Sequence, residues 1–237
     1  MPCRFLSLPG FALFFLPVIL SGATPTPAPV PDLPTWKEEI AQGFVPYHQL
    51  TVDDFPVRNA GKENEFFIKT FITPHYQYYL YFNRGWVHAY IKQWRVFSGF
   101  DRNDSYRERR FKEMKASLPY AQAILDLSEI HARELAAMPP EGFPESRSGS
   151  QEETVNGLAE KIKARSARVF AEAEREIDAL AKATDQGRDL RKTRQLAAEI
   201  SRRLQATPEP TPFGLPPETA PSPSASPKPS AIPASTR

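Results

Sequence analysis

The sequence predicts an α+β protein in which a short antiparallel sheet is followed by long helices, between proline-rich termini that stay disordered. Three observations support this prediction. Residues 65–81 are dense in aromatic and β-branched side chains, which favours strands. After residue 117, apolar residues recur at three- and four-residue steps, which is typical of amphipathic helices. The 25 prolines of the 237-residue chain gather toward its two ends, which leaves roughly 170 residues for a packed core.

The first 23 residues have the organisation of a secretory signal peptide. Arg4 precedes an apolar run from Phe11 to Leu20, and Ser21-Gly22-Ala23 provides the small residues that a signal peptidase recognises. We therefore expect cleavage after Ala23 and a secreted or periplasmic protein, with no membrane span in the mature chain. A membrane anchor is the alternative, but this run is about half of the ~20 residues that span a bilayer, and Pro17 interrupts it.

Cysteine content and charge exclude several functions. Cys3 is the one cysteine of the chain and would leave with the signal peptide, so the mature protein would have no disulfide and no catalytic thiol. Removal of Arg4 changes basic against acidic residues from 30 against 28 to 29 against 28, a formal charge of +1. This balance predicts no nucleic acid as partner. Basic and acidic side chains alternate over residues 101–115, which favours a solvated helix face.

The domain boundaries follow from composition. Residues 24–34 alternate proline with small residues and predict an extended linker. The domain covers residues 35–206, beginning with a short helix over 36–42, an extended segment, and a turn at Asp53 and Asp54. These two carboxylates are interpreted as turn and cap residues rather than as a catalytic pair. Residues 207–237 have hardly any large apolar side chains to offset their ordering entropy, which predicts a disordered tail.

The strands of the domain are expected in its first half. Two are predicted within residues 65–81, with a break near Pro74, because proline cannot donate to a sheet ladder. Residues 86–97 fit both a strand and a short helix, and we favour a strand for their first part. Turn-forming residues over 138–150 predict a surface loop.

A helix is predicted over residues 118–135, between the half of the domain that resembles strands and the half that resembles helices. Ser117 is a suitable N-cap, Pro119 falls in the first turn, and no glycine or proline recurs until Pro139. A longer helix is predicted over 153–183. Residues 184–187 then end this helix, and Gly187 is suited to a left-handed cap. A last helix covers 189–204.

The long helix over 153–183 carries one apolar stripe. We expect this stripe to pack against the domain core, and pairing with a partner helix in a coiled coil is the alternative. Its residues are Val155, Leu158, Ile162, Val169, Ala173, Ile177 and Leu180.

Residues in four segments carry a resemblance to a known family. The central helix contains Asp126, Leu127, Glu129, Ala132, Arg133 and Leu135, which match the second half of HEQGHFDIAELYARxL with leucine at its isoleucine. The segment from Leu50 to Phe55 is similar to LTWDDF, and residues 85–87 to SWV. Residues 184–187 fall where YDxETxHG occurs. In these matches the chain resembles a family of secreted zinc-dependent proteases, which implies a zincin-like fold.

The resemblance also implies where a metal site would lie. In an HExxH helix two histidines four residues apart bind one zinc ion, and the glutamate between them is the general base. The family's HG segment offers a third histidine. In this chain Tyr120 and Ile124 stand at the two histidines, Ala121 at the glutamate and Gln186 at the third histidine. Hydrocarbon side chains cannot bind zinc, and a phenol or an amide is a poor ligand.

We therefore expect no metal, no cofactor and no catalytic residue at the degenerate positions Tyr120, Ala121, Ile124 and Gln186. The predicted function is that of an exported, catalytically inactive family member, with a binding or scaffolding role in the cell envelope and an unidentified protein partner. Two alternatives stay open. One is an active hydrolase with an unrecognised site, in which Glu129, Glu134 or a histidine converges with other polar groups in a cleft. The other is an envelope interaction protein that acts through its long helix.

Two geometric expectations accompany this interpretation. If the resemblance holds, Tyr120 and Ile124 face the turn that carries Gln186 across a small apolar pocket. The histidines are scattered without ligand spacing and are interpreted as structural residues, one of them paired with Glu134. They are His48, His75, His88 and His131.

Overall fold

The computed structural model describes residues 36–58, 66–109, 111, 113–137, 145–210 and 213. All of them belong to one compact unit, Asp32–Arg237, whereas a second unit, Met1–Pro31, lies outside the described residues. The predicted signal peptide, the linker and most of the predicted tail therefore fall outside this description. Within it, antiparallel strands and long helices confirm the α+β class.

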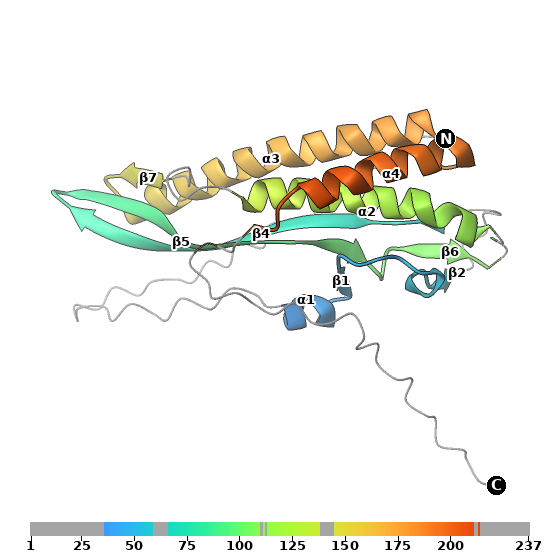
Figure 1. The fold of residues 1–237 in the computed structure, drawn as a ribbon. Helices are drawn as coiled ribbons and strands as arrows, with labels where there is room; N and C mark the ends of the chain where they lie inside the picture. Colours follow the sequence, from blue (N-terminus) through green and yellow to red (C-terminus); the bar gives the residue numbers. More distant parts are fainter. Residues whose placement is uncertain are drawn as a thin grey trace, which may run out of the picture. The chain divides into compact units, whose positions relative to one another are not determined.

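A long antiparallel hairpin forms the main sheet (Figure 1). Its strands are β4 (Thr70–Asn83) and β5 (Trp86–Asp101), so the prediction of a short sheet was wrong. Arg84 and Gly85 join them with φ angles of 47° and 80°, the left-handed pair that a two-residue type I′ turn requires. The strands β1 (Phe44–Pro46) and β7 (Glu145–Ser148) pair with the other edge of β5.

Pro74 lies within β4 and does not divide it. It pairs with Val96, and the predicted break near residue 74 was therefore wrong. In the described part of the chain β4 is an edge strand, and an edge accommodates a residue that cannot donate a hydrogen bond. The irregularity of the hairpin is a bulge in β5, where Lys92 has no counterpart between Gln77 and Tyr78 of β4. Residues 86–97, ambiguous in the sequence, are strand throughout.

A second, three-stranded sheet contains short strands only. It has β6 (Tyr106–Glu108) between β2 (Val57–Arg58) and β3 (Phe66–Phe67), with β2 parallel and β3 antiparallel to β6. The solvated helix face predicted over 101–115 was wrong for this strand, where Glu108 is buried. Pairing with two strands outweighs the charge pattern here.

The central helix, α2 (Met114–Ala136), begins one turn earlier than predicted. The N-cap position is Glu113 rather than Ser117, and Pro119 lies inside the helix rather than in its first turn. The extra turn is held by Met114, whose side chain is buried in the core. The N–H groups of Ala116 and Ser117 both donate to the Glu113 carbonyl oxygen, at 2.9 and 3.1 Å.

The other helices lie close to their predicted positions. They are α1 (Trp36–Ala41), α3 (Gln151–Ala183) and α4 (Leu190–Ala206). The Ser150 hydroxyl caps α3 by accepting from the Glu153 N–H at 3.2 Å. Strand β7 corrects the predicted loop over 138–150, of which residues 138–144 lie outside the described part. No described helix is both long enough and apolar enough to cross a bilayer.

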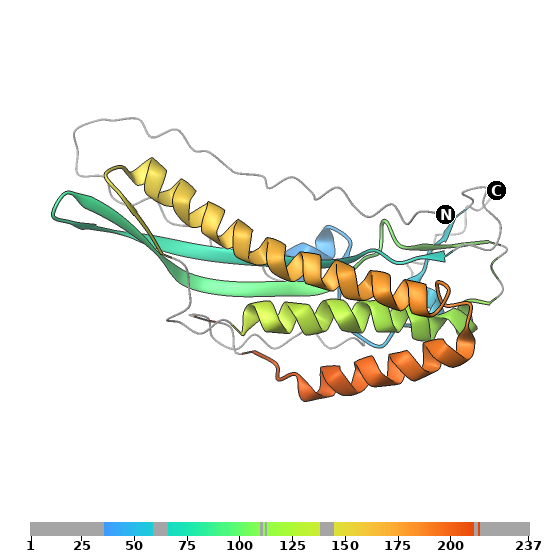
Figure 2. The ribbon, with the colours of Figure 1, turned by 90° about the horizontal axis from the view of Figure 1, so that it is seen from above.

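Helices α2 and α3 pack against one face of the main sheet, and α4 packs against α2. Figures 1 and 2 show α2 lying on the strands, between α3 and α4. The apolar stripe of α3 packs against the domain core, as expected, because five of its residues are almost fully buried. These are Leu158, Ile162, Ala173, Ile177 and Leu180. The two other residues of the stripe, Val155 and Val169, are partly buried.

A tight turn joins α3 to α4, with positive φ at Asp185 (48°), Gln186 (57°) and Gly187 (85°). The left-handed conformation predicted for Gly187 is confirmed. The Thr184 hydroxyl is fully buried, donates to the Leu180 carbonyl oxygen at 2.7 Å and accepts from the Gly187 N–H at 3.1 Å. These bonds fix the turn against the end of α3.

Candidate functional site

The four degenerate positions lie where α2 meets the turn between α3 and α4. Ala121 is completely buried, Ile124 is 9% exposed, and both belong to the core cluster that contains Ile177 and Leu180 of α3. Tyr120 is also buried and packs edge-on against Phe66, at 6.3 Å between ring centroids. The helix face that would carry a catalytic motif is therefore part of the core.

The turn contacts this face at Tyr120. A Cβ atom added to Gly187 would lie 2.8 Å from Cγ of Tyr120, so the turn backbone and the aromatic ring are in contact. The small apolar pocket expected between the two elements is filled at this point. Gln186 itself is exposed on the turn.

These residues do not fit a zinc site. Ala121 and Ile124 have no donor atom, and their side chains fill core volume where an imidazole and a carboxylate would need water and a metal. Among the residues that the structure describes, no three His, Cys, Asp or Glu side chains converge on a point suited to a metal ion.

A buried polar network extends from α2 to the segment between β1 and the 3₁₀ turn Val52–Asp54. The Gln122 side-chain oxygen accepts from the Leu50 N–H at 2.7 Å, and its amide nitrogen donates to Oδ1 of Asp126 at 2.7 Å. The Tyr47 hydroxyl donates to the same oxygen at 2.9 Å. The network holds this segment, which resembles the family's LTWDDF, against the helix.

Burial controls the ionisation of this network. Burial raises the pKa of the Asp126 carboxyl group, although hydrogen bonds from Gln122 and Tyr47 act in the opposite direction. Burial, followed by the charge of Asp126, also raises the pKa of the Tyr47 hydroxyl. The folded state therefore binds a proton on Asp126 more tightly than an unfolded chain does.

We expect this raised pKa to make stability depend on pH. The contribution is full below the ordinary Asp pKa and is lost as the pH rises through the raised folded-state pKa. Asp126→Asn retains an oxygen for both donors and removes the charge, so its stability relative to the unsubstituted protein should increase from pH 4 to pH 7 in urea denaturation. Asp126→Ala, the matched control, leaves the partly buried Tyr47 hydroxyl without its acceptor and Gln122 Nε2 with only its 3.4 Å bond to the His48 carbonyl oxygen, and should lose about 1–3 kcal/mol. An advantage of Asp126→Asn that decreases with pH would contradict this assignment.

A second group of polar side chains connects α2 to β5 and to the end of α4. The Arg133 Nε donates to Oε1 of Glu129 at 2.7 Å, and the Ser98 hydroxyl donates to Oε2. The Arg133 Nη1 donates to the Thr207 carbonyl oxygen at 2.9 Å. Glu129 thus converges with polar groups, but they are its structural partners within the helix–sheet interface.

His131 lies at the junction of the three long helices and is almost fully buried. Its Nδ1 is 2.9 Å from Oε2 of Glu134, which confirms the predicted pair. Its Nε2 is 3.4 Å from Oε1 of Glu176 on α3, without hydrogen-bond geometry. Arg203 of α4 bonds to both carboxylates. This network connects helices and gives no sign of a nucleophile or base directed at a substrate.

The remaining histidines are separate from one another, and each contacts a different polar side chain. Asp54 caps its own turn by accepting from the N–H and the hydroxyl of Thr51, at 2.7 and 2.9 Å, which confirms its predicted role. The histidine contacts are His48 Nε2 with Asp54 Oδ1 at 3.1 Å, His75 Nε2 with Glu39 Oε1 at 3.3 Å, and His88 Nδ1 with the Tyr90 hydroxyl at 3.5 Å.

The distal end of the β4–β5 hairpin presents aromatic side chains that sequence reasoning did not assign to a site. Both views show the hairpin end extending past the start of α3 (Figures 1 and 2). Its inner face contributes Ala89 and Ile91 to the core with Leu158. Its outer face carries what we call the aromatic face: Tyr79, Tyr81, Trp86, His88 and Tyr90.

The aromatic face is ordered by cross-strand contacts. Tyr79 stacks on Tyr90 at 5.3 Å between ring centroids, and the Arg147 guanidinium from β7 lies 4.3 Å from the Trp86 ring centroid. Tyr79, Tyr81 and Trp86 nonetheless remain 50%, 53% and 44% exposed. Alternation of these residues in the two strands was the signal in the sequence that could have identified this surface.

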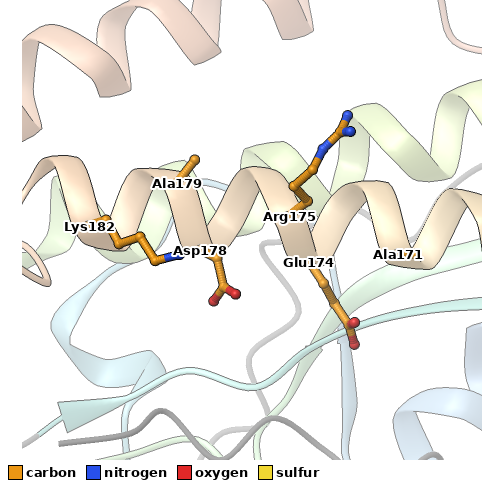
Figure 3. Close-up of a pocket in the computed structure, with 6 residues that line it drawn as sticks. All are labelled: Ala171, Glu174, Arg175, Asp178, Ala179 and Lys182. Atoms are coloured by element: carbon orange, nitrogen blue, oxygen red, sulfur yellow. The ribbon is translucent and has the colours of Figure 1, made fainter.

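A shallow depression on the surface of α3 offers no comparable chemistry. It is lined by Ala171, Glu174, Arg175, Asp178, Ala179 and Lys182 (Figure 3). All six come from one helix, and Figure 3 shows Glu174 and Asp178 pointing to one side and Arg175 to the other. No second described element supplies a group that would converge with them.

Comparison with protein-family models, with curated proteins and with solved structures found no match. The evidence on function therefore comes from the chain's own residues and their arrangement.

Proposed function

We propose that this protein is an exported, catalytically inactive relative of secreted zinc-dependent proteases with a zincin-like ancestry, which acts as a binding or scaffolding protein in the cell envelope. One observation carries the loss of activity. The positions at which the resemblance calls for two ligands and a base hold Tyr120, Ile124 and Ala121, and all three side chains are buried in the core.

The residues that match the family pattern have structural partners. Asp126 accepts from Tyr47, Glu129 pairs with Arg133, and Leu135 is 2% exposed. Selection for packing would retain these side chains after metal chemistry was lost, since each connects α2 to its neighbours. We place the binding role at the aromatic face, because large exposed aromatic side chains are characteristic of contact sites.

The binding role and the rival hydrolase make opposite predictions for a peptidase assay. Purified protein beginning at Thr24 should hydrolyse no unstructured protein or peptide library above the background of the Glu129→Gln variant, and a chelator should change nothing. The substitution is isosteric and keeps one oxygen that can accept from Arg133, while its amide NH2 can donate to the Ser98 hydroxyl oxygen. Hydrolysis that Glu129→Gln or a chelator abolishes would refute the proposal and favour the hydrolase.

A further inference from the structure

Among the residues that the structure describes, the distal half of β4 is an open sheet edge without the usual protection. In the described part of the chain no strand pairs with the outer side of β4. Soluble proteins protect such edges with charges, prolines or bulges. In β4 the one such device is Pro74, in the proximal half, because the bulge of this hairpin lies in β5, at Lys92. Residues 78–83, Tyr-Tyr-Leu-Tyr-Phe-Asn, contain no charge, proline or glycine.

The same six residues expose large aromatic groups. Tyr79, Tyr81 and Phe82 are 50%, 53% and 65% exposed. An uncharged, aromatic segment of high β-propensity at an open edge favours the addition of another strand. Two independent features, the free edge and the exposed rings, therefore occur at one place.

We propose that residues 78–82 of β4 pair antiparallel with the same residues of a second copy of this chain, about a two-fold axis at Leu80. This inference rests on the binding role proposed above and names its partner. In this register Tyr79 of one copy lies opposite Tyr81 of the other, so that two aromatic cross-strand pairs form on one face. The sheets join into one, and the aromatic faces of the two hairpins become continuous.

Self-pairing fits this strand because of its charge. A two-fold axis places like residues near one another, and a charged edge would repel its own copy. Residues 78–83 have no charge to repel. Coverage of the three exposed rings in both copies would bury roughly 700 Å² of aromatic surface. With the paired backbone added, the interface approaches the ~1,000 Å² lower bound of specific interfaces.

Sedimentation velocity of protein beginning at Thr24 tests the pairing. The unsubstituted protein should pass from monomer to dimer as its concentration rises. The double variant Tyr79→Lys/Tyr81→Lys places lysines opposite each other and should raise the dissociation constant at least tenfold. The matched variant Tyr79→Lys/Tyr81→Glu disturbs each hairpin to the same extent but places Lys opposite Glu of the other copy. It should dimerise more tightly than the double lysine variant, and added salt should reduce the difference.

Two results would overturn the proposal. One is unsubstituted protein that stays monomeric at several hundred micromolar, which would leave the open edge to the strand of another protein. The other is equal association of the two double variants, with matching circular dichroism and melting temperatures, which would exclude this register. Neither result affects the proposed loss of catalysis, because that loss is tested separately by hydrolysis and by zinc content.

Discussion

Replacement of Ala121 by glutamate, the residue that the family carries there, is expected to lower the free energy of unfolding by more than about 3 kcal/mol. Ala121 is completely buried within the core cluster formed by α2 and α3. A glutamate would overpack this site and bring a carboxylate into the core without a partner. Urea denaturation followed by circular dichroism measures the effect.

Ala116→Glu is the matched control for this substitution. Ala116 lies in the first turn of the same helix, is only partly buried, and occupies an end of the helix dipole that favours a carboxylate. Its replacement should change stability by less than about 1 kcal/mol. Similar small losses for both variants would show that the core at Ala121 accommodates a catalytic glutamate, contrary to our interpretation.

Gly187→Ala is expected to cost about 2–4 kcal/mol, from two causes that can be separated. The first is a φ angle of 85°, which L residues avoid. The second is contact of the new methyl group with the inner atoms of Tyr120, at 2.8–3.0 Å. Denaturant titration gives the total loss.

Gly85→Ala isolates the first cause. Gly85 has a similar φ of 80°, but nothing lies within 4 Å of an added Cβ. Its replacement should cost about 1–2 kcal/mol from backbone strain alone. Equal losses for the two variants would mean that the turn is not packed against Tyr120. The contact between α2 and the turn, on which the location of the degenerate positions depends, would then be absent.

The helical half of the domain was predictable because its signals are local. The period of Leu158, Ile162 and Ile177 indicates the buried face of α3, and Gly187 indicates the turn that ends it. Caps and periodicity act within one helix, so one sequence contains them. The start of α2 differed because burial of Met114, a tertiary contact, extends the helix past its best capping residue.

The sheet was less predictable because strand stability depends on distant partners. Pro74 breaks a central strand but is accommodated at an edge, and the sequence does not say that β4 is an edge. Strand β7 forms because residues 145–148 pair with β5, although their composition is that of a loop. The aromatic face was missed for the same reason, since Tyr79 and Tyr90 meet only across the hairpin.

The candidate site was predicted in part. The sequence indicated that Tyr120 would lie near the turn after α3, and Gly187 contacts it. It did not indicate why Asp126, Glu129 and Arg133 fit the family pattern. In the fold these three residues connect α2 to the β1 segment, to β5 and to the end of α4. The contacts of these three residues therefore give a structural reason for side chains of these types at these positions of the central helix.

The zinc content of the purified protein tests the central claim most directly. Protein that begins at Thr24 should be prepared with excess zinc, passed over a desalting column and measured by inductively coupled plasma mass spectrometry. Our account predicts much less than one zinc ion per chain and a melting temperature that a chelator leaves unchanged. One tightly bound zinc ion per chain, whose removal lowers the melting temperature, would contradict it.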